Sequence, residues 1–159
     1  MPMRPTKKVS DSQTQQQYIL RPAHINPYGR LFGAQLLKWI DEVAGIVAVR
    51  HANAIVTTAA IDNLQFTKPA FAGQMIVLCG RITYVGRTSM EVRVDTYTEA
   101  LDGTRQLINK AYIDMVAINN EGKAIEVPTL ETETEEERLE FEAGIKRKEM
   151  RKKRLLEDF

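Results

Sequence analysis

A single segment, residues 31–50, limits what this 159-residue chain can fold into more than any other feature. It has the length of a helix, and its two glycines are its only weak points against helix formation. At about 100° per residue, Gln35, Lys38 and Glu42 gather on one narrow face, while apolar residues occupy most of the remaining circumference. A helix this apolar has to be buried on more than one side. The charges in its middle argue against membrane insertion.

The chain that follows shows the alternating pattern that predicts strands. Turn residues separate the runs, and Asp102-Gly103 is a strong signal for a hairpin. Residues 89–100 alternate most clearly, with apolar side chains on one face and Glu91, Arg93 and Asp95 on the other. This alternation predicts a sheet with one face exposed to water. The expected strands are a short one over residues 18–20 and long ones over 55–66, 74–84, 89–100 and 106–118.

Long antiparallel strands after one apolar helix predict an α+β fold, in which an antiparallel sheet wraps around one long central helix. A single sheet covers only one side of that helix. The other side is therefore expected to meet a second copy of the protein, so a homodimer is predicted.

The two ends of the chain differ from this central domain, which is expected to span residues 15–130. Residues 1–14 are polar and are expected to form a disordered tail. Residues 131–159 begin with seven glutamates over 131–142, and seven lysines and arginines follow over 146–154, which favours a charged helix. Thr134 and Glu137 form a candidate capping box. Two interpretations of this helix stay open. It is either exposed to solvent, or its basic end contacts the phosphate of a nucleic acid or of a nucleotide-bearing ligand.

Composition excludes several classes of protein. The net charge of +1 and the 43% of hydrophobic residues are typical of a soluble globular protein that is not built around a polyanion. Cys79 is the only cysteine, which excludes an intramolecular disulfide and fits a cytoplasmic location. His24 and His51 are too few for a histidine metal site, so no metal is expected. Neither a membrane nor a nucleic acid is the expected partner, and the sequence contains no P-loop, GxGxxG, GxSxG or HExxH motif.

Asp41 is the polar residue that most needs an explanation. On the helical plot it lies beside small and apolar residues, away from the centre of the polar face. A carboxylate held there loses part of its hydration, which is costly unless hydrogen bonds or function compensate, and such a group suits general-base chemistry. The small neighbours leave room for a substrate. The alternative is that Asp41 reaches the helix edge and binds water or a basic side chain.

A second candidate feature is the start of the same helix. Free backbone N–H groups and the positive end of the helix dipole favour an oxyanion near Gly33, and the Asn26 amide suits orienting a water or polarising a carbonyl. The alternative is that Asn26 caps the helix and Gly29 only turns the chain. Gly33 and Asp41 are eight residues apart, which is about 12 Å along a helix. They therefore act on the same carbon only if they come from two chains across an interface.

The order of these motifs resembles that of a known family. Residues 26–33 followed by 40–48 resemble the helix signature of the hot-dog-fold acyl-CoA thioesterases, specifically the cytosolic acyl-CoA hydrolase group. The similarity continues through residues 61–66 and 85–92, and it extends over residues 18–128. The resemblance implies a hot-dog fold and an acyl-CoA thioesterase that hydrolyses fatty acyl-CoA to free CoA and a fatty acid.

The resemblance also implies roles for single residues. In that family an Asn before the helix and an Asp within it act from different protomers, and they correspond to Asn26 and Asp41 here. Asp41 is expected to act as a general base on water or as the nucleophile, while the backbone at Phe32 and Gly33 stabilises the oxyanion. Thr58 is expected to donate a supporting hydrogen bond.

The turn between the second and third long strands is expected to line the CoA groove, again by resemblance. Gly86, Thr88 and Ser89 are expected near the pantetheine or the phosphates, and Arg87 and Lys68 are expected to pair with phosphate. CoA is then part of the substrate, and no separate cofactor is expected. The family favours a homo-oligomer built as a trimer of dimers, while acyl chain length and nucleotide regulation stay open.

Two other classes of function stay open as alternatives. An acyl-thioester dehydratase or hydratase shares this fold, but it typically pairs a histidine with an acid, and no histidine lies near Asp41 in the helix. A non-catalytic acyl-CoA or nucleotide sensor, or a module whose basic tail binds nucleic acid, needs no carboxylate at this position.

Overall fold

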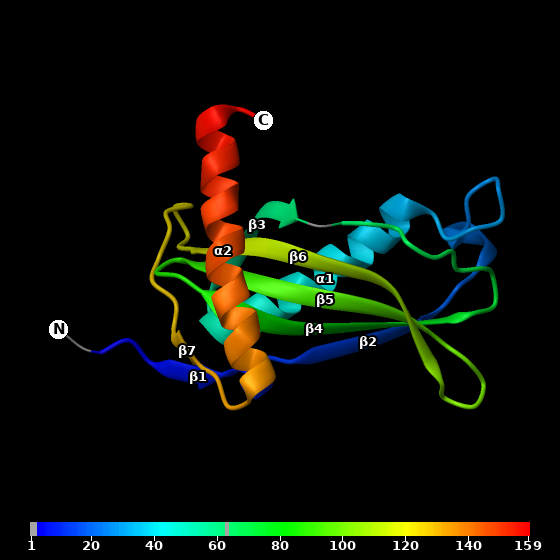
Figure 1. Cartoon of the computed structure of the whole chain (residues 1–159), viewed down its shortest axis with the longest axis horizontal. Helices are drawn as coiled ribbons and strands as arrows, with labels where there is room; N and C mark the ends of the chain where they lie inside the picture. The colour runs from blue at the N-terminus through cyan, green and yellow to red at the C-terminus, as the bar shows by residue number, and fades with distance from the viewer. Residues whose placement is uncertain (1–2, 63) are drawn as a thin grey trace.

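The computed structural model describes residues 3–62 and 64–159, so Met1, Pro2 and Asn63 lie outside the described residues. The predicted helix and long strands are present, with their ends shifted by a few residues (Figure 1). In this part of the chain no helix combines the length and the apolar character that spanning a membrane needs. The elements, with η for a short 3-10 helix, are β1 (Thr6–Lys8), η1 (Val9–Asp11), β2 (Thr14–Ile19), η2 (Pro22–His24), α1 (Gly33–Ala52), β3 (Ile55–Asp62), β4 (Met75–Val85), β5 (Ser89–Glu99), β6 (Arg105–Ile118), β7 (Thr129–Glu131) and α2 (Glu135–Glu157).

The long strands form one antiparallel sheet, with α1 against one of its faces (Figure 1). Over the described residues, five strands pair in the order β2-β4-β5-β6-β3. The face toward α1 is apolar, and Val92 and Val94 of β5 are buried there together with Ile40, Val43 and Val47 of α1. The predicted α+β arrangement, a sheet curled around one long helix, is confirmed.

α1 lies close against β4 at Gly80. A Cβ on this glycine would stand 2.7 Å from Val43 Cγ1 and 3.0 Å from Val47 Cγ2. A larger residue would push the helix away from the sheet, because protein cores leave no room for an added methyl group at such distances. Gly80 therefore sets how deeply α1 sits on the sheet.

The sequence predicts that the sheet face opposite α1 is exposed to water, and this prediction is wrong. α2 crosses the strands on that face (Figure 1). Glu91 of β5 is completely buried there, and Asp95 is 2% exposed. Arg147 of α2 donates two hydrogen bonds to the Glu91 carboxylate, at 3.0 and 2.8 Å. Alternation along a strand shows which side chains share a face, but it does not show whether another element covers that face.

α2 begins at the predicted cap. Thr134 Oγ1 accepts the N–H of Glu137 over 3.1 Å, while the Glu137 carboxylate accepts the N–H of Glu133 over 2.7 Å. Further along, the Arg147 and Arg151 side chains reach buried carboxylates of the sheet. α2 is therefore a packed element with one solvated side, and the interpretation of a helix exposed all round does not hold.

The prediction of a disordered tail over residues 1–14 is wrong from Arg4 onward. β1 pairs in parallel with β7, and the partners lie 123 residues apart in the chain. Val9 is 1% exposed, and Arg4 Nε donates to the carbonyl oxygen of Val127 over 2.8 Å. Because β1 and β7 are short, mostly polar and distant in sequence, no local pattern indicates that they pair.

Candidate active site

Asp41 lies near the middle of α1, and β3 holds its carboxylate. Thr58 Oγ1 donates a hydrogen bond to Asp41 Oδ1 over 2.6 Å and lies 3.5 Å from Met115 Sδ. The position of this hydroxyl follows from the pairing of β3 with β6, which sets Thr58 opposite Met115 immediately before a β-bulge. Asp41 is half-buried, and among the described residues its carboxylate has no other hydrogen-bond partner. The second oxygen, Oδ2, is thus left for a water or a substrate.

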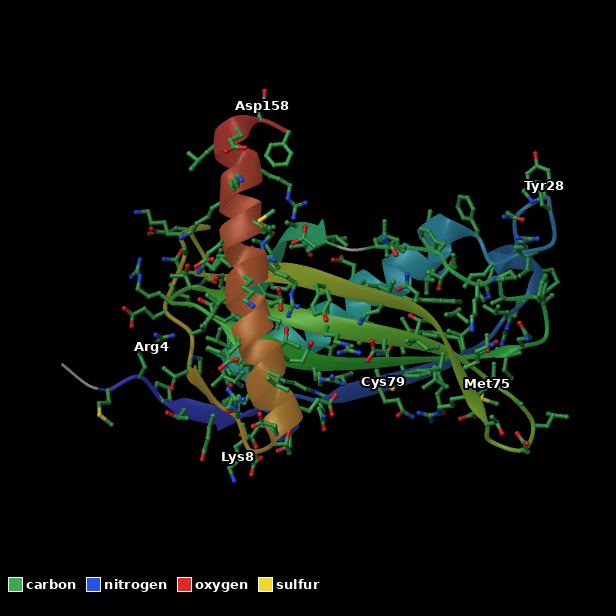
Figure 2. All side chains as sticks on the ribbon, viewed as in Figure 1. Arg4, Lys8, Tyr28, Met75, Cys79 and Asp158 are labelled. Atoms are coloured by element: carbon green, nitrogen blue, oxygen red, sulfur yellow. The ribbon has the colours of Figure 1, made fainter. Side chains whose placement is uncertain are left out.

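Asn26 closes the turn that leads into α1. Its side-chain Oδ1 accepts the backbone N–H groups of Tyr28 and Arg30, at 2.9 and 3.1 Å. The backbone N–H of Asn26 donates to the Arg30 carbonyl oxygen over 2.7 Å. Gly29 in the same turn has φ +84°, a conformation that favours glycine. Tyr28 projects from the tip of this loop, 87% exposed (Figure 2). The turn therefore uses the oxygen of the Asn26 amide, which leaves Nδ2 for a ligand.

The first turn of α1 leaves backbone N–H groups free. Phe32, the residue before the helix, supplies no side-chain cap, and its own N–H donates to the His24 carbonyl oxygen over 2.8 Å. The N–H groups of Gly33 and Ala34 have no backbone acceptor among the described residues. Of the two residues expected to stabilise an oxyanion, only Gly33 keeps its N–H available.

A cavity of about 320 Å³ opens at this helix start and brings together several of the predicted residues. Asn26, Gly33 and Lys68 all line it. Phe66 lines it as well, and its ring atom Cζ would lie 3.4 Å from a Cβ on Gly33, so the ring covers the start of the helix. No role for Phe66 is predicted from the sequence. Its position within residues 61–66, part of the family resemblance, is the one signal that points to it.

The pair formed by Asp41 and Thr58 lies outside this cavity. The helical rise places Gly33 and Asp41 about 12 Å apart along α1. Each chain therefore holds two separate groups of candidate residues, one at the start of α1 and one near its middle. Further along the helix, Val49 is 46% exposed and Ile46 is half-buried, so part of the apolar surface of α1 is not covered by its own sheet.

The turn between β4 and β5 lies at the opposite end of the sheet from the start of α1 (Figure 1). Gly86 N–H donates to the Ser89 carbonyl oxygen over 2.9 Å, and the Thr88 carbonyl oxygen accepts the N–H of Ala117 over 3.1 Å. Arg87 pairs with Glu126 at 3.6 Å. Within one chain, the structure does not bring these residues to the cavity that holds Asn26.

The remaining titratable candidates have structural partners. His51 is buried, and its Nε2 lies 2.8 Å from the Pro128 carbonyl oxygen. Burial lowers the pKa of His51 and raises the pKa of the Cys79 thiol. His24 Nδ1 accepts the Arg21 N–H over 3.1 Å. Over residues 3–62 and 64–159, no group of three or more His, Cys, Asp or Glu side chains is arranged to hold a metal ion.

Comparison with known proteins finds this architecture repeatedly. The model of the thioesterase superfamily matches residues 28–102. YkhA of Bacillus subtilis, an uncharacterized acyl-CoA thioester hydrolase, is 36% identical over 134 residues, which cover 84% of this chain and 78% of that protein. An apo-hexameric acyl-CoA thioesterase is 40% identical, with a TM-score of 0.91 and coverage of 95% of this chain and 97% of the other. The acyl-CoA hydrolase of Staphylococcus aureus, solved with butyryl-CoA, CoA and CoA disulfide, is 32% identical, with a TM-score of 0.92 and coverage of 97% and 94%.

A curled antiparallel sheet around one long helix defines a hot-dog-fold domain, and in this chain Asp41 lies near the middle of that helix. The hot-dog fold implied by the sequence is confirmed. The chain belongs to the thioesterase superfamily, within its group of acyl-CoA thioester hydrolases.

Proposed function

We propose that this protein hydrolyses acyl-CoA thioesters to free CoA and a carboxylate, at sites that two copies of the chain build together. The 2.6 Å hydrogen bond from Thr58 to Asp41 carries this proposal, because it fixes a carboxylate away from the helix start of the same chain. The cavity at that start supplies the complementary groups, the Asn26 amide and the free N–H of Gly33. Two antiparallel copies of α1 bring the start of one helix beside the Asp41 of the other.

The reaction needs a nucleophile, an oxyanion donor and a leaving thiolate. In one route, Asp41 removes a proton from a water whose oxygen attacks the thioester carbonyl carbon, while the Gly33 N–H stabilises the oxyanion. The tetrahedral intermediate collapses, the carbon–sulfur bond breaks, and the thiolate takes up the proton. In a second route, the Asp41 carboxylate attacks the thioester carbonyl carbon, the carbon–sulfur bond breaks, and the CoA thiolate leaves and takes a proton from water. Water then hydrolyses the mixed anhydride to the acyl carboxylate and free Asp41. Label from heavy-oxygen water that enters the Asp41 carboxylate during repeated turnover identifies the second route, with water attacking the Asp41 carbonyl of the anhydride.

Variants of a related enzyme support this choice of residues. Solved structures of Staphylococcus aureus acyl-CoA hydrolase include variants in which an Asn, an Asp or a Thr is replaced by alanine. Those positions are 15 and 17 residues apart along that chain, as are Asn26, Asp41 and Thr58 here. The equal spacing supports assigning these three residues to one kind of site.

The same proposal covers binding, assembly and location. Residues 86–89 and Lys68 contact the pantetheine or the phosphates of CoA, and CoA belongs to the substrate. The hexameric state of a 40% identical thioesterase supports a trimer of dimers for this chain. The free thiol of Cys79 is consistent with the reducing cytoplasm.

Release of free thiol from a series of acyl-CoAs, from acetyl to palmitoyl, tests the proposed function. Wild type is expected to turn over one or more of them, and Asp41→Ala is expected to lose about 100-fold or more in kcat, as the loss of a general base does. Circular dichroism and CoA binding show that the variant still folds. If the wild type binds CoA but hydrolyses no acyl-CoA, the hydrolase proposal is wrong and the sensor alternative takes its place.

A further inference from the structure

A second cavity opens between α2 and the edge strand β3, and no role proposed above uses it. Its volume is about 590 Å³. The C-terminal half of α2 lines one side with Lys148, Arg151, Lys152 and Arg154, and Ala59 of β3 lines the other. The cavity lies where α2 crosses the sheet and continues past β3 (Figure 1). This cavity is named the α2 groove.

Arginines already neutralise the carboxylates that the sheet presents to the α2 groove. Asp62 Oδ2 lies 2.9 Å from Arg151 Nη1, and its other oxygen lies 3.4 Å from Arg154 Nη2. Asp114 Oδ1 lies 3.6 Å from Arg151 Nη2. A third carboxylate, Asp158, lines the groove from the C-terminal end of α2 (Figure 2). The two arginines are thus committed to the sheet and hold α2 in place.

Lys148 and Lys152 add two positive charges to the groove that take no part in the ion pairs of Asp62 and Asp114. They are four residues apart, so they share one face of α2. Among residues 3–62 and 64–159, neither ammonium group has a carboxylate oxygen within 4.0 Å. Lys148 Nζ lies 3.4 Å from Ser89 Oγ and 5.5 Å from the centre of the Tyr84 ring. Because Ser89 belongs to the turn proposed to contact CoA, that turn and the α2 groove form one continuous surface.

A phosphate-bearing molecule with a flat ring fits this surface. Two neighbouring ammonium groups favour a diphosphate. Leu155 and Phe159 line the groove, are 84% and 69% exposed, and offer apolar surface on which a ring can lie. We infer that the α2 groove binds a nucleoside diphosphate through Lys148 and Lys152 and, resting on the proposed function, that this is the nucleotide end of acyl-CoA. A free nucleotide carries the same chemistry, and experiment separates the two.

Two double variants provide the test. Lys148→Ala/Lys152→Ala removes both ammonium groups of the α2 groove, and Lys146→Ala/Lys153→Ala removes the same charge from exposed positions of the same helix that do not line the groove. Analytical ultracentrifugation and thermal unfolding compare both with the wild type. Calorimetry then measures ADP binding. Kinetics measure kcat/KM for an acyl-CoA and for the matching acyl-pantetheine, which lacks the nucleotide.

The groove variant is expected to bind ADP at least about tenfold more weakly, since contacts to charged groups are lost, while the control variant binds it as the wild type does. If the nucleotide is the end of CoA, the ratio of kcat/KM for acyl-CoA over acyl-pantetheine falls by a similar factor, and ADP competes with acyl-CoA. ADP binding that depends on the two lysines but does not compete with acyl-CoA identifies a free nucleotide as the ligand.

The inference is overturned if the wild type does not bind ADP, or if the groove variant binds it unchanged. It is also overturned if the groove variant changes the oligomeric state, which would make the α2 groove an interface between copies of the chain. Failure of the proposed function gives a different result. In that case the wild type hydrolyses neither thioester, while the ADP measurement still decides whether the α2 groove is a nucleotide site.

Discussion

At Asp41, one short hydrogen bond decides which carboxylate oxygen is available for chemistry. Thr58 Oγ1 donates a hydrogen bond to Oδ1 over 2.6 Å, which leaves Oδ2 free for a water or a substrate. A hydrogen bond to a charged group contributes about 1.5–3 kcal/mol, and here it also fixes the rotamer of the carboxylate. The same reasoning applies at Asn26, whose Oδ1 accepts two backbone N–H groups and whose Nδ2 is left for a ligand. Both side chains are oriented before any substrate arrives.

Thr58→Val removes the hydroxyl and keeps the shape of the side chain. We expect kcat for acyl-CoA hydrolysis to fall about 10- to 100-fold, the factor that corresponds to the lost hydrogen bond. KM is expected to change less, because Thr58 positions Asp41 and does not itself hold the substrate. Thr58→Ser restores a hydroxyl and should recover most of the activity. Equal activity of the valine and serine variants would show that this hydroxyl does not position the carboxylate.

His51 is expected to make stability depend on pH. Burial lowers the pKa of its imidazole, its Nε2 lies 2.8 Å from the Pro128 carbonyl oxygen, and among the described residues its Nδ1 has no partner. The unfolded state, with a pKa of about 6.5, therefore binds more protons as the pH falls below that value. The free energy of unfolding should fall there, by up to about 1.4 kcal/mol for each unit by which the folded pKa is lowered.

Urea unfolding of the wild type and of His51→Gln, at about pH 8 and about pH 5.5, measures this dependence. Gln retains an amide donor for the Pro128 carbonyl oxygen and does not titrate. The wild type should lose more stability than the variant between the two pH values. An equal loss would assign the pH dependence to other groups.

Among the elements, α2 is the one whose position the sequence does not indicate, because alternation along a strand does not show which element covers the sheet. It is attached to the sheet by a buried network, in which Glu91 accepts hydrogen bonds from Arg147 and from Arg151, the latter at 3.3 Å. The helix approaches closely at Gly144, where a Cβ would stand 2.5 Å from Tyr84 Cβ and 3.2 Å from a Glu91 oxygen. The absence of a side chain at this glycine allows the arginines that follow it to reach the sheet.

Gly144→Ala should therefore destabilise the protein, although alanine has a higher helix propensity than glycine. In an exposed helix the change stabilises by roughly 0.5–1 kcal/mol, whereas here the methyl group overlaps Tyr84 and is expected to destabilise the protein by about 1–3 kcal/mol. Chemical denaturation measures the difference. Glu149→Ala, on an exposed position of the same helix, serves as the control and should change stability by less than about 0.5 kcal/mol. A stabilising effect of Gly144→Ala would mean that α2 does not pack here as described.

For the whole molecule, the separation of the two groups of candidate residues is the decisive fact. Asp41 and Thr58 lie near the middle of α1, while Asn26 and Gly33 line a cavity at its start. A site that needs both groups is complete only in an assembly. In the proposed twofold dimer the same arrangement would occur twice, which would give each dimer two composite sites.

Mixing two inactive variants tests this arrangement. Asn26→Ala and Asp41→Ala are each expected to be inactive, because every site lacks one group. A heterodimer of the two carries one intact site and one that lacks both groups. Random exchange of subunits should therefore restore about a quarter of the wild-type activity. Activity that stays at the level of the separate variants after exchange would show that both groups act from one chain.

The fold class and the place of the carboxylate follow from the sequence without tertiary information. The apolar helix, the alternating strands and the Asp102-Gly103 hairpin are local patterns, and each is present in the structure. The eight-residue distance between Gly33 and Asp41 is also a sequence property, since helical rise converts it directly into length. Such features depend on neighbours a few positions away, which is why a periodic pattern can indicate them.

Only the folded chain shows what covers the outer face of the sheet and which groups stay free at the site. Glu91 and Arg147 are 56 residues apart, and their pairing turns a face that the sequence predicts to be wet into a buried one. The N–H of Phe32 donates to the His24 carbonyl oxygen and is therefore not free for an oxyanion. The α2 groove forms where α2 crosses β3. The Glu91–Arg147 pair and the α2 groove join segments distant in sequence. The packing of whole elements determines these contacts, so no local periodicity of the sequence can predict them.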